Sequence, residues 1–333
     1  MNRNSNHIVF IDNFNEYNYY YNKNSVLKTD VTFKHGIFEL TNNTLIRKLC
    51  LFHYKFCYKG ILPYSSMNLW KHILFRNLFP SNTNKNYLIV TAAIYVNFLQ
   101  FGILNYIKKL YGCKIIIFFS DIVNSYKNLD INKMRLECDL ITTYNEIDAK
   151  TYGFEMRPPI VFDIKYELDN NFDTDVYFVA RPKGRMDTIY DIYEKCINAG
   201  LRCNFNICSK KDKRYPGINF IDTISYTKII SCTHKTKCIL NIMQPGSSGV
   251  TLRDIEAYNN GVFIISNNNS NELEQIFNKE QHIYMTNNNF DQELNKIKLM
   301  TKRFEKKTNT YTYDNFFNWI IEKLNNNDKE TNK

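Results

Sequence analysis

Short apolar runs recur along this chain, and most are followed by a segment whose apolar residues repeat with helical spacing. In the first half these runs are His7–Asp12, Tyr87–Ala92, Lys114–Phe119, Asp139–Thr143 and Pro159–Phe162. They are apolar throughout instead of alternating, which is typical of parallel strands covered by helices on both faces. Helical spacing is found over Leu45–Tyr58, Met67–Leu78 and Tyr95–Leu110. The pattern predicts a doubly wound α/β domain.

The same alternation starts again in the second half. Its apolar runs are Val176–Ala180, Leu201–Cys208, Ile218–Ile221, Cys238–Met243, Val262–Ser266 and His282–Met285. A chain of 333 residues suits two domains of about 150 residues better than one. We therefore predict an α/β protein with two Rossmann-like, doubly wound domains that face a central cleft. The predicted parts are an N-terminal domain over 1–164, a linker over 165–175, a second domain over 176–310, and a C-terminal helix with a disordered tail over 311–333.

Cysteine usage and the longest apolar segment indicate where the protein works. The nine cysteines form no CxxC pair, which favours reduced core thiols over metal ligands or a disulfide framework. The polar N-terminus resembles no secretory signal. The apolar segment Tyr87–Ile107 is interrupted by Asn97, Gln100 and Asn105, so it reads as a strand and a helix and not as a membrane span. These observations predict a cytoplasmic protein.

The formal net charge is +10, and it is unevenly distributed. Between Thr41 and Ser120 the chain has no acidic residue, whereas ten basic residues lie there: Arg47, Lys48, Lys55, Lys59, Lys71, Arg76, Lys85, Lys108, Lys109 and Lys114. A long stretch with one sign of charge attracts anions. Within it, Met67–Phe79 has an apolar helical side. This segment is either an amphipathic helix at an anionic membrane surface or a core helix with a solvated basic face.

The same positive charge has an alternative interpretation, in which the protein is a basic protein that binds nucleic acid. The basic residues lie in an apolar half of the chain, and no recognised nucleic-acid-reading motif accompanies them. We therefore expect no nucleic acid among the partners.

The strongest local motif is Gln244–Ala257, which follows one predicted strand and opens a predicted helix. Gly246 and Gly249 let backbone amides approach a ligand closely, and the start of a helix attracts anions. The hydroxyl groups of Ser247, Ser248 and Thr251 add donors, and Glu256 is placed to bind a vicinal diol such as a ribose. The alternative is an ordinary turn between strand and helix, with Glu256 in a surface ion pair.

A second motif, Ala180–Arg185, follows the first strand of the second half. Its three cations, Arg181, Lys183 and Arg185, suit a diphosphate, because guanidinium groups make forked contacts and ammonium groups act as point charges. A solvated basic turn is the alternative. Diphosphate binding is favoured because both motifs leave the same edge of the same predicted sheet.

Three pieces together, the Arg-x-Lys-Gly turn, Ile224-Ser-Tyr226 and the run Gly246–Ala257, resemble the donor-binding domain of GT-B glycosyltransferases. The resemblance is greatest to bacterial enzymes of lipopolysaccharide and capsular polysaccharide synthesis. It implies that the cationic turn binds the donor diphosphate, that the helix start cradles phosphate, that Glu256 holds the ribose, and that Tyr226 lies near the base. The implied donor-binding residues are Arg181, Lys183, Arg185, Tyr226, Gly246, Ser247, Ser248, Gly249, Val250, Thr251 and Glu256.

One position departs from the family pattern and bears on the mechanism. Where better-known members carry a second glutamate, eight residues before the ribose glutamate, this chain has Ser248. An inverting reaction needs a general base for the acceptor hydroxyl. The candidates are Asp121 and Asp12, which follow predicted strands of the first domain, and His35 and His53 are weaker alternatives. Whether the reaction inverts or retains stays open.

No metal ion or organic cofactor is expected, and the nucleotide sugar serves as co-substrate. Asp173-Thr-Asp175 is similar to a metal-binding carboxylate pair, but it lies in the predicted linker before a strand. The expected function is a metal-independent, hexosyltransferase-like enzyme that transfers sugar to a glycan or lipid-linked acceptor in surface polysaccharide or glycoconjugate synthesis. The alternatives are a nucleotide-sugar epimerase of the same fold and a non-catalytic basic binding protein.

Overall fold

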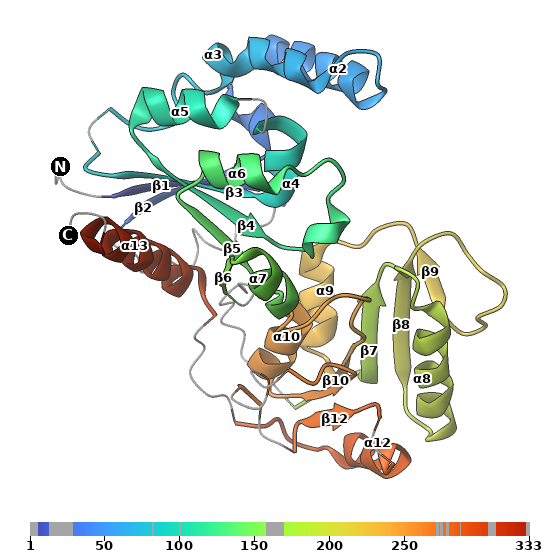
Figure 1. The fold of residues 1–333 in the computed structure, drawn as a ribbon. Coiled ribbons are helices and arrows are strands. Elements are labelled where there is room, and N and C mark those ends of the chain that lie inside the picture. Colours follow the sequence, from blue (N-terminus) through green and yellow to red (C-terminus); the bar gives the residue numbers. More distant parts are fainter. Residues whose placement is uncertain are drawn as a thin grey trace. The chain divides into compact units, whose positions relative to one another are not determined.

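The structure is a computed structural model, and its sheets divide the chain into two units (Figure 1). The described residues are 6–12, 29–81, 83–99, 102–157, 170–270, 273, 276–277, 280–286, 288–305 and 311–330. The first unit comprises Met1–Tyr144, Asp148–Arg157 and Tyr313–Lys333, and the second comprises Asn145–Ile147 and Pro158–Thr312. Each contains a six-stranded sheet whose paired strands are all parallel. The predicted doubly wound α/β architecture is confirmed.

The sheet of the first unit has the strand order β2-β1-β3-β4-β5-β6. Its strands are β1 (His7–Asp12), β2 (Asp30–His35), β3 (Asn86–Thr91), β4 (Lys114–Phe119), β5 (Leu140–Thr143) and β6 (Glu155–Met156). Strand β2 was not predicted, because it is a partly exposed edge strand in which polar and apolar residues are mixed. The predicted strand Pro159–Phe162 lies outside the described residues.

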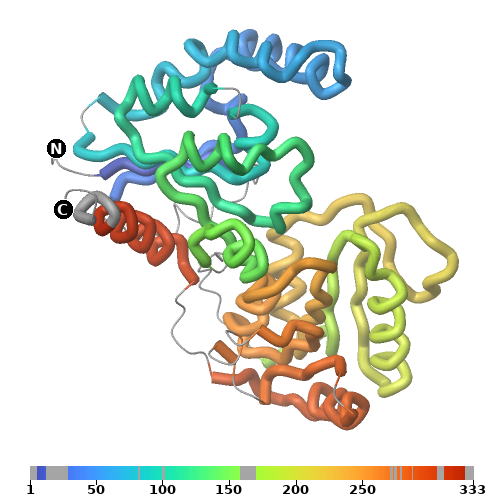
Figure 2. The backbone as a smooth tube through the Cα atoms, viewed as in Figure 1, coloured from blue at the N-terminus to red at the C-terminus, as the bar shows by residue number. Residues whose placement is uncertain are grey.

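Alternate residues of these strands pack into two layers. Val9, Leu88 and Ile117 belong to the core beneath the helices of one face, which include α5 (Ile103–Tyr111) and α6 (Ile131–Glu137). The opposite face meets α13 (Tyr313–Glu330), where Phe10 contacts Phe317 with ring centroids 6.4 Å apart. Figure 2 shows this red C-terminal helix beside the blue N-terminal strands. The last helix of the chain therefore completes the first unit.

The acid-free segment Thr41–Ser120 forms several helices of the first unit as well as the buried strands β3 and β4. Helix α2 (Thr44–Tyr58) begins at Asn43, whose side chain accepts hydrogen bonds from two backbone amides, and exposes Leu49 and Phe52. The predicted amphipathic helix Met67–Phe79 is wrong. That segment forms a 3₁₀ turn, η2 (Tyr64–Trp70), and a short α3 (Lys71–Leu74), because its apolar residues divide between the core and the surface.

The sheet of the second unit has the order β12-β11-β10-β7-β8-β9. Its strands are β7 (Thr174–Ala180), β8 (Cys203–Cys208), β9 (Asn219–Ile221), β10 (Thr236–Asn241), β11 (Phe263–Ser266) and β12 (His282–Tyr284). The helices are α8 (Met186–Asn198), α9 (Tyr226–Thr233), α10 (Leu252–Asn260) and α12 (Phe290–Leu299) among the described residues. Every predicted strand of this half is present. The inner strands β7, β10 and β11 are largely apolar and buried on both faces, whereas β8 and β9 mix polar and apolar residues.

One end of the predicted linker differs in the structure. Asp175 is a buried residue of β7, and its carboxylate pairs with Arg202 and Lys237, each at 3.1 Å, so this part of the predicted linker belongs to the sheet. Residues 165–169 of that linker lie outside the described residues. Among the described helices, none has the length and apolar character needed to cross a membrane.

Candidate functional site

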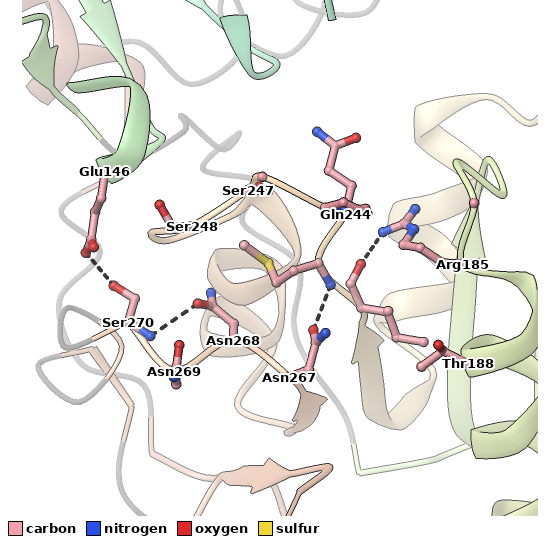
Figure 3. Close-up of a pocket in the computed structure, with 15 residues that line it drawn as sticks. Glu146, Arg185, Thr188, Gln244, Ser247, Ser248, Asn267, Asn268, Asn269 and Ser270 are labelled. Atoms are coloured by element: carbon pink, nitrogen blue, oxygen red, sulfur yellow. Dashed lines mark hydrogen bonds between the residues drawn. The ribbon is translucent and has the colours of Figure 1, made fainter. Parts of the chain in front are cut away.

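A cavity of about 550 Å³ lies where three loops leave the second sheet (Figure 3). Because the strands are parallel, the segments that follow β7, β10 and β11 emerge at one edge. The lining residues are Glu146, Gly184, Arg185, Thr188, Ile242, Met243, Gln244, Pro245, Gly246, Ser247, Ser248, Asn267, Asn268, Asn269 and Ser270. The two predicted motifs thus contribute to one cavity, together with a third segment, 267–270, that the sequence analysis did not identify.

The glycine-rich turn forms one wall of this cavity. Gly246 and Gly249 have φ values of 78° and 83°, in the left-handed region that glycine enters without strain. The Ser247 amide donates to the Gln244 carbonyl at 3.0 Å, which closes the turn. The Ser248 hydroxyl donates to Oδ1 of Asn145 at 2.8 Å and accepts from the Ile147 amide at 3.1 Å. The serine hydroxyl therefore orders the turn itself.

Helix α10 begins at Thr251 with a capping box. The Thr251 amide and hydroxyl both donate to Oδ2 of Asp254, at 2.7 and 2.8 Å. Among the described residues, this leaves the amides of Leu252 and Arg253 without a partner at the helix start. Val250 is fully buried, so it anchors the turn in the core. An anion bound at the start of α10 would therefore find fewer backbone amides available as hydrogen-bond donors than the sequence analysis predicts.

Asp254 was missed by sequence reasoning, and it is fully buried. Besides Thr251, its carboxylate accepts from Nδ2 of Asn241 at 2.9 Å and from Nδ2 of Asn268 at 3.3 Å. Burial raises the pKa of Asp254 to about 6, although these hydrogen bonds act in the opposite direction. The Thr-x-x-Asp spacing of a capping box is the local signal that identifies Asp254. The two asparagines give no such signal.

Glu256 and Tyr226, two of the predicted donor-binding residues, contact one another, although neither is among the residues that line the cavity. The Tyr226 hydroxyl donates to Oε1 of Glu256 at 3.0 Å, and the Arg253 guanidinium pairs with Oε2. Arg253 also donates to the carbonyl of Val179 at 3.2 Å. The Glu256 side chain is 5% exposed, so the alternative of a surface ion pair is wrong. Its role at a ribose stays a prediction.

The three cations of the basic turn have different surroundings. The Arg185 guanidinium donates to the carbonyls of Pro182 (3.3 Å), Arg181 (3.0 Å) and Ile242, which ties the turn to the end of β10. Arg181 and Lys183 are exposed and are not among the residues that line the cavity. Burial raises the pKa of the Cys208 thiol, and the charge of Arg181 opposes this shift, which puts Arg181 near the end of β8.

In the first unit, Asp12 and Asp121 lie at the carboxyl ends of β1 and β4, two strands that are separated by β3. Asp12 ends β1 and is 5% exposed, whereas Asp121 follows β4 and accepts a hydrogen bond from the Ile122 amide at 2.9 Å. Burial raises the pKa of the Tyr126 phenol, and both carboxylates raise it further. The two acids therefore lie close enough to act on one side chain.

A second cavity, of about 720 Å³, lies in the first unit on the carboxyl side of β3 and β4. It is lined by Pro63, Tyr64, Ser65, Ala93, Val96, Asn97, Ser125, Tyr126, Lys127 and Asn128. The weaker candidate His53 is not part of it. Its ring accepts from Trp70 at 2.7 Å and hydrogen-bonds Ser66 at 2.8 Å, so it has a structural role between α2 and η2.

Solved structures of known proteins share the fold of this chain, although no sequence comparison finds a match. No protein-family model and no curated protein sequence matches the chain. A solved α-glucosyltransferase in complex with UDP and a 13-mer DNA aligns with a TM-score of 0.56 at 10% identity, covering 89% of this chain and 90% of that one. An α-glucosyltransferase in complex with UDP-glucose and DNA aligns at 0.55 and 10%, covering 90% and 91%. The UDP-GlcNAc 2-epimerase from Methanocaldococcus jannaschii aligns at 0.47 and 11%, covering 96% and 99%. The chain has the GT-B fold.

The expectation that nucleic acid is excluded as a partner is wrong. The matched α-glucosyltransferases share this fold and are in complex with DNA. A basic surface binds nucleic acid through contacts with the phosphates, so binding does not require a recognised base-reading motif. The absence of such a motif was therefore insufficient ground for the exclusion.

Proposed function

We propose that this protein is a glycosyltransferase that moves a sugar from a nucleoside-diphosphate donor to an acceptor, with the donor held by the second unit. The observation that carries the proposal is the cavity at the carboxyl edge of that sheet. Its wall combines Gly246–Ser248 of the glycine-rich turn with Gly184 and Arg185 of the cationic turn. Doubly wound sheets bind ligands at this edge.

The residues suggest how the donor is held. Arg181 and Lys183 supply exposed cations for the diphosphate, and the amides of Leu252 and Arg253 add the positive end of α10. Stabilising the charge that develops on the leaving diphosphate is the main catalytic requirement. Because these groups supply positive charge, we propose a metal-independent hexosyltransferase. The matched α-glucosyltransferases are bound to UDP or UDP-glucose, which makes uridine nucleotides the first donors to test.

We assign the acceptor to the first unit. Its 720 Å³ cavity, with two tyrosine rings, amide side chains and Lys127, provides surfaces for a sugar or another polar acceptor. Asp121 is the preferred general base and Asp12 the alternative. A glycan or lipid-linked acceptor of surface polysaccharide synthesis is one class. DNA is a second class, because DNA is present in the matched α-glucosyltransferase complexes.

We further propose that the protein works in the cytoplasm and associates peripherally with a membrane. The specific observation is the surface of α2, where Leu45, Leu49 and Phe52 are 66%, 49% and 61% exposed. Exposed apolar side chains on a helix with basic neighbours are typical of interfacial helices. The charge of Lys48 and Lys55 on the same helix adds attraction to anionic lipids.

The test is a thermal-shift panel of nucleoside diphosphates and their sugars. A ligand at 100 times its Kd stabilises the folded state by roughly 2.7 kcal/mol, which is readily measured. We expect stabilisation by a nucleoside diphosphate and by at least one of its sugars. Failure of the whole panel contradicts the proposal. Product analysis without any acceptor separates a transferase from an epimerase, since only the epimerase converts the donor alone.

A further inference from the structure

Asp254 is the centre of a buried network that connects two of the three loops of the donor cavity, those that follow β10 and β11. Its carboxylate accepts four hydrogen bonds, two from Thr251 and one each from Asn241 and Asn268. Asn241 ends β10, just before the cavity wall Ile242–Ser248. Each partner therefore belongs to, or directly adjoins, a segment that forms the cavity.

Asn268 carries the network into the third loop. Its Nδ2 donates to the Gly249 carbonyl at 2.8 Å, and its Oδ1 accepts from the Ser270 amide at 3.2 Å. The Asn268 amide donates to the Ser266 hydroxyl at 2.9 Å. Asn268 lines the cavity but is only 3% exposed, because its side-chain amide is engaged in hydrogen bonds within the protein. The turn at Gly249 and the loop after β11 are thereby fixed to one another.

We infer that Asp254 is a positioning residue, which preorganises the donor cavity by holding the Gly246–Gly249 turn and the 267–270 loop against the end of β10. An ordinary capping residue needs only the contacts with Thr251. The bonds to Asn241 and Asn268 go beyond capping, because they reach the end of β10 and the loop after β11. The inference rests on the proposed function only in taking the cavity to be the donor site.

The ionised form of Asp254 matches its four hydrogen-bond donors. All four partners are donors, so a carboxylate matches each of them, whereas a protonated acid or an amide presents a hydrogen to another donor. These partners are neutral, and on α10 the adjacent Arg253 is paired with Glu256. Keeping a buried carboxylate ionised is unfavourable, and such strain is common where a site must be preorganised.

Hydrogen–deuterium exchange of the ligand-free protein tests the positioning directly. We expect Asp254→Asn to accelerate exchange in 242–251 and 266–270 by roughly tenfold or more, since a hydrogen-bonded charge is lost. Asp291→Asn, on the exposed first turn of α12, is the matched control and should leave these segments unchanged. Unaltered exchange within Thr174–Ala180, a strand of the same unit, reports that the variant is folded. Asn268→Ala, which removes one partner, provides a second test should Asp254→Asn fail to fold.

Binding of UDP-glucose provides the functional readout. This donor is chosen because its diphosphate lacks the terminal phosphate that titrates near pH 6. Affinity of the wild type should fall about fourfold between about pH 7.5 and about pH 5.5, whereas Asp254→Asn should bind weakly and without this pH dependence. Wild-type exchange and a wild-type pH profile in folded Asp254→Asn overturn the inference. Altered exchange without binding of any nucleotide sugar supports the positioning role and contradicts the proposed function.

Discussion

Arg253 and Glu256 form a buried ion pair on the first turns of α10, and the same arginine donates to the carbonyl of Val179 at 3.2 Å. The pair joins α10 to β7 at the edge of the sheet where the cavity opens. Tyr226 of α9 adds a hydrogen bond to the carboxylate at 3.0 Å. Glu256 is thus held by two other elements of the second unit.

The first prediction concerns the stability that this pair provides. Glu256→Ala leaves the Arg253 charge without its partner in a largely buried place, so the free energy of unfolding should fall by about 3 kcal/mol or more. Glu293→Ala is the matched control, because Glu293 pairs with Lys296 at the same spacing on an exposed helix. Its expected cost is about 0.5 kcal/mol. Equal losses for the two variants in urea unfolding would contradict the argument.

The second prediction tests the ribose role of Glu256. Glu256→Gln keeps the side-chain shape but weakens its acceptor strength toward a hydroxyl group. If the carboxylate holds the ribose, the variant should lose about tenfold in affinity for UDP and much less for 2′-deoxy-UDP. Calorimetric titration of both nucleotides measures the difference. Parallel losses for the two ligands would show that Glu256 acts only through the fold.

The third prediction distinguishes the cations of the basic turn. Arg181→Ala and Lys183→Ala should weaken UDP binding by about tenfold each, with little effect on uridine, which lacks the diphosphate. Arg185→Ala should lower the thermal midpoint as well, because Arg185 is hydrogen-bonded to three backbone carbonyls. Equal effects of Arg181→Ala on UDP and uridine would remove the diphosphate assignment.

The fourth prediction follows from two buried groups with opposite pH dependence. Burial raises the pKa of Asp254 from 3.8 to about 6, so the folded state binds a proton more tightly than the unfolded state does. The resulting contribution of Asp254 to the free energy of unfolding is full below pH 3.8 and is lost as pH rises through 6. Burial lowers the pKa of His282 from 6.5 to about 4, so its contribution is full above 6.5 and is lost as pH falls toward 4. In the wild type, the free energy of unfolding therefore falls with rising pH because of Asp254 and rises with pH because of His282, and the two effects oppose one another.

Asp254→Asn removes the pH dependence that Asp254 contributes to the free energy of unfolding. Between about pH 4 and pH 6 the free energy of unfolding of the variant should therefore rise by roughly 2 kcal/mol more than that of the wild type. Urea unfolding at a series of pH values gives both curves. If the two run parallel, Asp254 does not titrate in this range.

The fifth prediction concerns the surface of α2. The double variant Leu49→Ser, Phe52→Ser should weaken binding to anionic phosphatidylglycerol vesicles by at least about tenfold, because each side chain loses apolar burial. Leu299→Ser is the control, since Leu299 is 77% exposed in the second unit. Co-sedimentation at low and high salt measures the binding. Vesicle binding that the double variant retains in full would contradict a membrane role for this helix.

The local features of the site were largely predictable. The continuous apolar runs gave the strands of the second sheet, and Gly246 and Gly249 identified the turn that lines the cavity. Arg185 illustrates the limit, because the sequence could not distinguish a cation that contacts carbonyls from one that faces a ligand. Asn268 illustrates it again: one asparagine among several in a polar loop becomes a buried part of the site.

The sequence by itself determined the repeating order of strands and helices, since burial on both faces of a sheet leaves a continuous apolar pattern that is local in the chain. Only the tertiary structure decided which distant residues meet. It joined Asn241 and Asn268 to Asp254, placed Tyr226 on Glu256, and returned α13 to the first unit. Such contacts depend on how the strands are ordered within each sheet, and no local periodicity records that order.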